Sequence, residues 1–338
     1  MSKKEQIIEI LTLNPFISQK ELAEKIGLSR PAVANYIATL TREGIIKGRA
    51  YILQEETIVC IGAVNIDRIA KTKEPVQFEA SNPVEITETI GGVARNYAHT
   101  LQQLHIQTSM ITAVGDDTAG EMLLQTLNSD QINTDQVWIF PNEKTGTYTS
   151  LVSPTNESIV SMADMNIYEQ ITPKMIDNKW PHIQSAKGVF LDTNFNTEAI
   201  THIIERLQTQ QIPIFIDTVS PSKAKHLPED LSFVKLISLT TKELETLSRH
   251  TITNKKDMKQ GAKTIIDRGA ENIIIFHENE QLVYASKHDN ELRKFNKIPN
   301  IKSEREQDAL AACILSGLLK EKTIQQAIQQ SVSLIKQI

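Results

Sequence analysis

The first 55 residues carry apolar positions at helical spacing in three short segments. The first predicted helix spans residues 3–13 and ends at an Asn-Pro pair, which cannot continue a helix. A capping box formed by Ser18 and Glu21 opens the second helix, and the third spans residues 30–43. Because only a short turn separates the second helix from the third, the pattern predicts a helix-turn-helix.

After residue 56 the pattern changes to short apolar runs that alternate with amphipathic segments. Residues 57–72 are predicted to form the first strand of a buried sheet, and a helix over residues 197–210 separates two later strands. This alternation predicts an α/β fold in which right-handed crossovers join parallel strands. The polar residues that follow these strands are then expected at one edge of the sheet, where α/β proteins bind ligands: Asp67, Asp192, Asn194 and Asp217.

Residues 144–168 alternate threonine, tyrosine, valine and serine around a Pro-Thr-Asn turn. This alternation predicts a β-hairpin.

Composition is that of an ordinary globular protein, with 338 residues, 40% hydrophobic residues and 23% charged residues. No apolar run approaches the length of a membrane span, and the chain starts directly with a helix pattern, so a cytoplasmic location is expected. Cys60 and Cys313 lie inside apolar runs, which predicts buried thiols and neither a disulfide nor a metal site.

A polar segment, residues 302–307, precedes Asp308 and a run of small and apolar residues that predicts a buried helix. Asp308 is expected to be the N-cap of that helix. The free N–H groups and the dipole of a helix start also favour a phosphate at this point.

The segment around Asp308 resembles the hallmark of the ribokinase-like (PfkB) sugar and nucleoside kinases. The resemblance implies a three-layer α/β/α domain with a small β lid, over residues 57–338, the lid lying near residues 67–90 and 144–166. It also implies that Asp308 takes the proton from the substrate hydroxyl. The family's Gly-Ala-Gly, whose amides form an anion hole for the transferred phosphate, is replaced here by Arg305, Glu306 and Gln307.

The sugar-binding motifs of the family have close counterparts in this chain. The resemblance implies that an aspartate after the first strand binds sugar hydroxyls, and that a Gly-Gly-x-x-x-Asn turn closes over the sugar. The predicted substrate-binding residues are Asp67, Gly91, Gly92, Asn96, Asp164, Asp192 and Asn194. Taken singly, a double glycine could simply form a tight turn without a ligand, and an aspartate could simply cap a helix or a turn. The amino-acid sequence of residues 145–148 and 163–168 resembles the pseudouridine kinase branch in particular, whose members also carry an N-terminal helix-turn-helix.

The nucleotide-binding motifs of the family depart from the pattern at several positions. Thr240 replaces the asparagine of the family's Asn-x-x-Glu, while the glutamate is retained as Glu243. The resemblance implies that Glu243 acts on magnesium indirectly. The alternative is that Glu243 is a first-turn carboxylate favoured by the helix dipole. The family's Thr-x-Gly-x-x-Gly turn is represented by Phe276, Glu278 and Gln281. ATP and Mg²⁺ are therefore expected only if the kinase is active.

Residues 18–46 resemble the winged helix-turn-helix of bacterial transcription regulators, with residues 45–53 as the wing, so residues 1–55 are expected to form one domain. The resemblance implies that the third helix enters a major groove of DNA. The candidate DNA-binding residues are Ser29, Arg30, Pro31, Ala32, Asn35, Tyr36, Arg42, Lys47 and Arg49. The alternative is a three-helix cap or dimerisation module. Since residues 1–56 hold eight Lys/Arg against seven Asp/Glu, strong DNA binding would require a homodimer.

Two functions follow from these motifs. One is an ATP-dependent kinase of pseudouridine or a related nucleoside or sugar, regulated by its helix-turn-helix. The other, favoured by the altered nucleotide motifs, is a nucleoside-sensing transcriptional regulator with weak or no kinase activity.

Overall fold

The computed structural model describes residues 2–15, 17–47, 57–277, 281–288, 291–295 and 303–336. The chain divides into two units, residues 1–56, with which residues 180–187 are grouped, and the remainder.

The N-terminal unit consists of three helices: α1 (Lys3–Leu13), α2 (Gln19–Ile26) and α3 (Arg30–Arg42). Each helix begins at a serine whose hydroxyl oxygen accepts a hydrogen bond from the backbone N–H three residues later. Buried apolar residues from all three helices form the core of this unit. The helices therefore lie where the periodicity predicts them. Residues 48–53 of the predicted wing lie outside the described residues.

The larger unit is built on an eight-stranded sheet with the order β14-β13-β12-β11-β10-β9-β1-β4. The strands β1, β4 and β9–β12 are parallel, whereas β13 and β14 are antiparallel. Their bounds are β1 (Ile58–Ile61), β4 (Thr108–Ile111), β9 (Gly188–Asp192), β10 (Ile214–Asp217), β11 (Val234–Thr240), β12 (Asn272–His277), β13 (Gln281–Ser286) and β14 (Arg293–Phe295). The sequence pattern predicted parallel strands joined by crossovers, and these six strands agree with that prediction.

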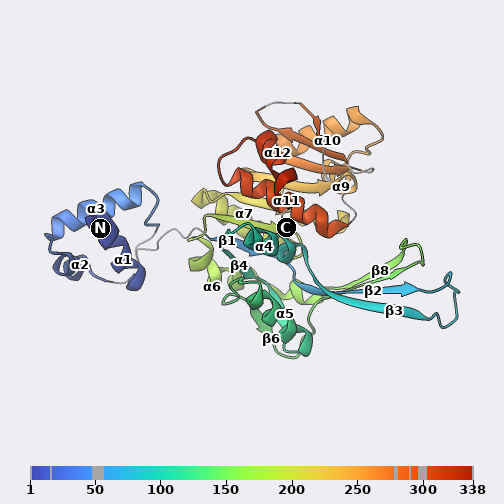
Figure 1. The fold of residues 1–338 in the computed structure, drawn as a ribbon. Coiled ribbons are helices and arrows are strands. Elements are labelled where there is room, and N and C mark those ends of the chain that lie inside the picture. Colours follow the sequence, from blue (N-terminus) through green and yellow to red (C-terminus); the bar gives the residue numbers. More distant parts are fainter. Residues whose placement is uncertain are drawn as a thin grey trace. The chain divides into compact units, whose positions relative to one another are not determined.

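Helices flank this sheet, as the three-layer prediction requires (Figure 1). They are α4 (Val93–Gln103), α5 (Thr118–Ser129), α6 (Pro173–Ile183), α7 (Thr197–Gln210), α8 (Pro221–Ala224), α9 (Thr241–Ser248), α10 (Lys255–Asp267), α11 (Glu304–Leu318) and α12 (Ile324–Leu334), with a 3₁₀ helix over Asn166–Gln170. The main core lies between the sheet and the helices α4, α11 and α12, and includes Tyr97 stacked on Phe190 with ring centroids 3.8 Å apart. A short pair, β5 (Ala113–Gly115) and β6 (Trp138–Phe140), completes the unit.

A separate four-stranded sheet, here called the lid, extends well beyond the main sheet (Figure 1). Its order is β3-β2-β7-β8, with the bounds β2 (Asn65–Thr72), β3 (Val84–Gly91), β7 (Thr147–Val152) and β8 (Ser158–Asp164). The hairpin predicted over residues 144–168 is formed by β7 and β8, which pair antiparallel.

The prediction of one strand over residues 57–72 is wrong, because this run forms two strands in different sheets. It provides β1 of the main sheet and β2 of the lid, and the chain turns between them at Gly62. Gly62 has a φ of 151°, and a Cβ there would stand 2.2 Å from Cγ of Asp192, so a side chain is excluded. As a result Asp67 lies on the lid, paired with Thr89 and Tyr148, rather than at the end of a main-sheet strand.

Across the described residues, no helix is both long enough and apolar enough to cross a membrane.

Candidate active site

A cavity of about 580 Å³ lies where the lid meets the carboxyl ends of the main-sheet strands. The lid contributes residues of β2, β3, β7 and β8 to its walls. The main domain contributes the starts of α4 and α11, the segments that follow β9 and β10, and the end of β11. The cavity is therefore in the position that parallel α/β sheets use for ligands.

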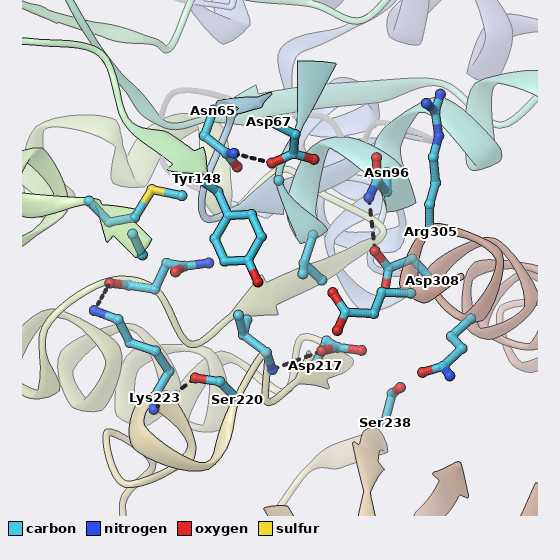
Figure 2. A pocket seen from close by; sticks show the side chains of 18 of the residues that line it. Asn65, Asp67, Asn96, Tyr148, Asp217, Ser220, Lys223, Ser238, Arg305 and Asp308 are labelled. Atoms are coloured by element: carbon cyan, nitrogen blue, oxygen red, sulfur yellow. Dashed lines mark hydrogen bonds between the residues drawn. The ribbon is translucent and has the colours of Figure 1, made fainter. Parts of the chain in front are cut away.

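Asp308 and Asn96 meet in the wall of this cavity, from two different helices (Figure 2). Nδ2 of Asn96 donates to Oδ2 of Asp308 at 2.9 Å, and the aspartate is only 8% exposed. Burial raises the pKa of Asp308 well above its usual range. The carboxylates of Asp217, Glu304 and Asp192 raise this pKa further, while the hydrogen bond from Asn96 lowers it. A carboxylate in this position can accept a proton or a hydrogen bond from a ligand hydroxyl.

The start of α11 differs from the prediction. The helix begins at Glu304, and Ser303 is its N-cap, so Asp308 lies inside the helix instead of capping it. The hydroxyl oxygen of Ser303 accepts from N of Glu306 at 3.3 Å, and the Ser303 carbonyl accepts from N of Gln307 at 3.2 Å. The segment that replaces the family's Gly-Ala-Gly is thus a helical turn. Two of its amides are already used by the protein.

On the lid side, Asp67 is held by a neighbour on the same strand (Figure 2). Nδ2 of Asn65 donates to Oδ1 of Asp67 at 2.6 Å. Burial raises the pKa of Asp67, while the bond from Asn65 and the charge of Arg305 lower it. Gly91 lies behind this carboxylate, where a Cβ would stand 2.1 Å from Oδ2 of Asp67. Gly91 therefore makes room for Asp67 instead of lining the cavity.

Asp192 was predicted to bind substrate, but its fully buried carboxylate joins three pieces of backbone. Its Oδ2 accepts from N of Ala63 at 2.9 Å and from N of Ala94 at 3.1 Å, and its Oδ1 accepts from N of Asn194 at 2.9 Å. Burial raises the pKa of Asp192 to about 6. We revise its predicted role, because it holds the end of β1, the start of α4 and the end of β9 together and does not line the cavity.

Asp217 and Glu243 form the wall next to Asp308. Oδ2 of Asp217 accepts from the hydroxyl of Tyr97 at 3.0 Å. Oε2 of Glu243 accepts from the hydroxyl of Thr218 and from N of Thr240, both at 2.7 Å. Burial and the charge of Glu243 raise the pKa of Asp217 to about 7. Glu243 is therefore a buried capping residue of α9 as well as part of the cavity wall.

The cavity includes most, but not all, of the residues predicted from the sequence. The predicted substrate residues Asp67, Gly92, Asn96 and Asn194 line it, whereas Gly91, Asp164 and Asp192 do not. The predicted nucleotide residues Thr240, Glu243, Phe276, Arg305 and Gln307 line it, whereas Glu306 does not. Glu278 lies outside the described residues, and of Gln281 only the backbone, at the start of β13, is described.

Sequence reasoning missed a number of residues of the cavity wall, among them Asn65, Tyr148, Lys223 and Glu304. The two-residue period of a strand connects Asn65 with Asp67, and Tyr148 lies in the predicted hairpin, so both had a local signal. Nζ of Lys223 lies 3.2 Å from both Oε1 of Glu169 and the carbonyl oxygen of Asn194. These partners are distant in sequence, and nothing local predicts them.

At the inner end of the cavity, the residues present differ from the phosphate-binding loop that the family resemblance implies for ATP. The amides of Glu306 and Gln307 donate to Ser303, and the carboxylates of Asp217, Glu243, Glu304 and Asp308 line the same region. The described part of the chain contains no group of three His, Cys, Asp or Glu side chains placed to bind a metal.

In the N-terminal unit, the third helix carries its candidate DNA-binding residues on the surface. Arg30, Pro31 and Asn35 are exposed, and Ala32 and Tyr36 are partly exposed. Ser29 is the N-cap of α3, Arg42 and Lys47 are exposed, and Arg49 lies outside the described residues.

A three-layer α/β/α domain whose cavity lies under a small lid sheet has the architecture of a ribokinase-like sugar or nucleoside kinase. The chain belongs to the pfkB family of carbohydrate kinases, whose family model matches residues 55–334. A model of a winged helix-turn-helix DNA-binding domain matches residues 2–47. These matches confirm both resemblances and the predicted fold.

Two relatives from Escherichia coli K12 are about 30% identical to the chain over the residues that align. It is 31% identical to the uncharacterized sugar kinase YeiI over 291 residues, which are 86% of this chain and 80% of that protein. It is 30% identical to a pseudouridine kinase over 232 residues, which are 69% of this chain and 74% of that protein.

Among solved structures, the ribokinase of Arabidopsis thaliana in complex with ribose and ATP has a TM-score of 0.68 to this chain. Its sequence is 14% identical, and the match covers 82% of this chain and 90% of that one. At this identity the likeness establishes the fold alone.

Proposed function

We propose that this protein is a DNA-binding regulator that senses a nucleoside or related sugar in its kinase-like domain and has weak or no kinase activity. The observation that carries the proposal is the start of α11, where Glu304–Gln307 form a helical turn capped by Ser303. In this arrangement the amides of Glu306 and Gln307 are hydrogen-bonded to Ser303. Losing one preorganised anion-hole donor costs about 2.7–4 kcal/mol of transition-state stabilisation, so losing two would slow transfer on the order of ten-thousand-fold.

The polyol-binding side of the cavity supports ligand binding without transfer. Asp67, Asn65 and Asn96 line it with carboxylate and amide groups. Hydroxyl-rich ligands are recognised by such groups, because each hydroxyl both donates and accepts. The relationship to a pseudouridine kinase makes a pseudouridine-like nucleoside the preferred candidate.

The N-terminal unit supplies the proposed output, with residues 1–55 as the DNA-binding domain and residues 57–338 as the sensor. Exposed residues of α3, such as Arg30 and Asn35, would contact the major groove, while Arg42 and Lys47 would contact phosphates. The ligand would change DNA affinity by binding one conformation of the protein better than another. A role on DNA agrees with the cytoplasmic location expected from the sequence.

A homodimer would present two such domains, and the lid offers a surface for it. Ile86, Ala70, Leu151 and Val160 pair across all four strands as one row. By strand alternation this row faces away from Asp67 and the cavity. Ile86 is 61% exposed and Val160 is 46% exposed, which leaves an apolar row for a second copy to cover. Analytical ultracentrifugation should find a dimer, and the variant I86E/V160E should be monomeric.

Calorimetry with the full-length protein tests the proposed function. Pseudouridine should bind, ATP with Mg²⁺ should not, and the nucleoside should change the affinity for DNA fragments selected with the same protein. Binding of ATP followed by phosphate transfer at a rate typical of kinases would contradict it.

A second candidate is an ATP-dependent nucleoside 5′-kinase, and the position of Asp308 favours it. Asp308 lies in the cavity wall beside Asn96, where a base for the ligand hydroxyl is needed. Transfer of labelled phosphate from ATP to pseudouridine, lost in Asp308→Asn, would establish this activity.

A further inference from the structure

The exposed side of α10 carries a cluster of lysines on a unit that is acidic as a whole. Lys255, Lys256, Lys259 and Lys263 lie within the 13 residues of this helix, and all four are exposed. The helix contains two acidic residues, whereas residues 57–338 contain 28 Lys/Arg and 34 Asp/Glu. The positive charge on α10 is therefore local and does not reflect the composition of the unit.

The four lysines share one side of the helix because of their spacing. Lys255, Lys259 and Lys263 recur every four residues, so they lie about 6 Å apart along the helix axis. Lys256 lies next to this row, about a quarter of a turn away from Lys255. These four residues are here called the lysine face.

The opposite side of α10 fixes the helix on the larger unit. Met258, Ala262 and Ile265 are buried there, and the helix packs on α9, β12 and β13 (Figure 1). Gly261 allows a close approach to α9, since a Cβ at this position would stand 3.2 Å from Oγ of Ser248. The lysine face is therefore presented by a helix that is held in position along its length.

The two carboxylates of α10 leave most of this charge unpaired. Oδ2 of Asp257 accepts from N of Thr253 at 3.1 Å and from its Oγ1 at 2.7 Å, so this carboxylate is turned toward the segment before the helix. Asp267 pairs with Lys263 at 2.7 Å. In the part of the chain that the structure describes, the other three lysines of the face form no ion pair.

Double-stranded DNA is the partner whose charge fits the lysine face. Each DNA strand is a regular row of phosphates, and a row of lysines can neutralise them without contacting a base. The same chain carries a segment that matches a winged helix-turn-helix DNA-binding model, at residues 2–47. Residues 1–56 hold eight Lys/Arg against seven Asp/Glu, so this unit alone gains little affinity from the release of counterions. The lysine face can supply the electrostatic contribution that the N-terminal unit lacks.

We infer that the lysine face of α10 binds the phosphate backbone of double-stranded DNA, as a second contact that does not depend on the base sequence. It rests on the proposed function, because DNA binding by this protein is part of that function. The N-terminal unit would then select the sequence, and α10 would add affinity that falls steeply with salt.

The test measures fluorescence anisotropy of a labelled mixed-sequence duplex with the full-length protein over a range of salt concentrations. The variant K255Q/K256Q/K259Q removes the three unpaired charges and keeps residues that favour a helix. If each lysine contacts one phosphate, the slope of log affinity against log salt becomes shallower by about 2.7. The advantage of the wild type over the variant should then shrink roughly 40-fold between about 50 and about 200 mM salt.

Two further measurements separate the lysine face from net charge and from misfolding. The control variant K144Q/K174Q/K225Q removes the same charge at exposed positions outside α10 and should keep the wild-type salt slope. Pseudouridine should bind the wild type and the lysine-face variant equally, because α10 does not line the cavity. The preference for a DNA fragment selected with the wild type over the mixed-sequence duplex should also be unchanged, because phosphate contacts do not read bases.

The two proposals fail in different ways. A wild-type salt slope in the lysine-face variant, or an equal change in the control variant, would overturn the inference and leave the sensor proposal standing. Loss of binding to vesicles of anionic lipid with unchanged binding to DNA would assign the lysine face to a membrane surface and would also overturn the inference. Absence of DNA binding by the wild type at low salt would overturn both proposals.

Discussion

Replacing residues 305–307 by the family's Gly-Ala-Gly, in the variant R305G/E306A/Q307G, should unwind the first turn of α11. Each glycine costs a helix about 1 kcal/mol relative to alanine. Removing Glu306 from the first turn loses a further 0.3–1 kcal/mol or so of favourable interaction with the helix dipole. The total of about 2–3 kcal/mol exceeds the roughly 1 kcal/mol that an N-cap such as Ser303 contributes. The amides of residues 306 and 307 would then be released.

Two measurements follow this change. Hydrogen exchange should become faster at the amides of residues 306 and 307, and calorimetry should detect binding of pyrophosphate, which needs no adenine site. The control is R305A/E306A/Q307A, which removes the same side chains but keeps a strong helix former at each position. It should neither unwind nor bind pyrophosphate.

The reasoning would be refuted if the alanine variant bound pyrophosphate as well as the glycine variant does. The charge of the side chains, and not the helical turn, would then be what prevents the wild-type protein from binding pyrophosphate. Faster exchange in the glycine variant without any anion binding would also contradict it, because released amides would not be sufficient.

Three further predictions concern other parts of the site. Gly62→Ala should destabilise the larger unit by about 3 kcal/mol or more in urea unfolding, because the new Cβ would overlap the buried carboxylate of Asp192. The matched control is Gly27→Ala at an exposed position, where no atom lies within 4 Å of the new Cβ, so that it reports backbone strain alone. In the folded protein the pKa of Asp192 is about 6 and that of Asp217 about 7, both above the pKa of an aspartate in the unfolded chain. The free energy of unfolding should therefore fall as the pH rises, by about 2–3 kcal/mol between pH 5.5 and 8. A urea midpoint that stays constant over that range would contradict this prediction. Tyr148→Ala should weaken binding of pseudouridine more than binding of ribose, whereas Tyr148→Phe should retain it, because the ring lines the cavity opposite the main domain; equal losses for both ligands would exclude a contact with the base.

The helices could be predicted because their ends are fixed by neighbouring residues. Ser18 with Glu21 and the start of α7 at Thr197 follow from local capping and periodicity alone. The start of α11 was misjudged although a local signal was present. Ser303 with Glu306 three residues later is itself a helix-start pattern, and the helix begins there and not at Asp308, where the apolar run starts.

The site was predictable where it depends on strand period or on motifs, as for Asp67, Asn96 and Asp308. It was not predictable where distant segments meet. The break at Gly62 is imposed by Asp192, which lies far along the chain, and the same contact removes Asp192 from the cavity wall. Such contacts depend on tertiary packing, which a linear pattern does not contain.

The three backbone amides that donate to Asp192 predict which mutants a genetic selection would recover. Substitutions at this position should yield protein that is degraded or insoluble, since the walls of the pocket lose their common anchor. If the protein is the proposed regulator, mutants that fold and bind DNA but no longer respond to the nucleoside should instead arise at Asn65, Asp67 or Asn96. A selection for such unresponsive alleles would then map the ligand contacts without recovering Asp192, which holds them in position.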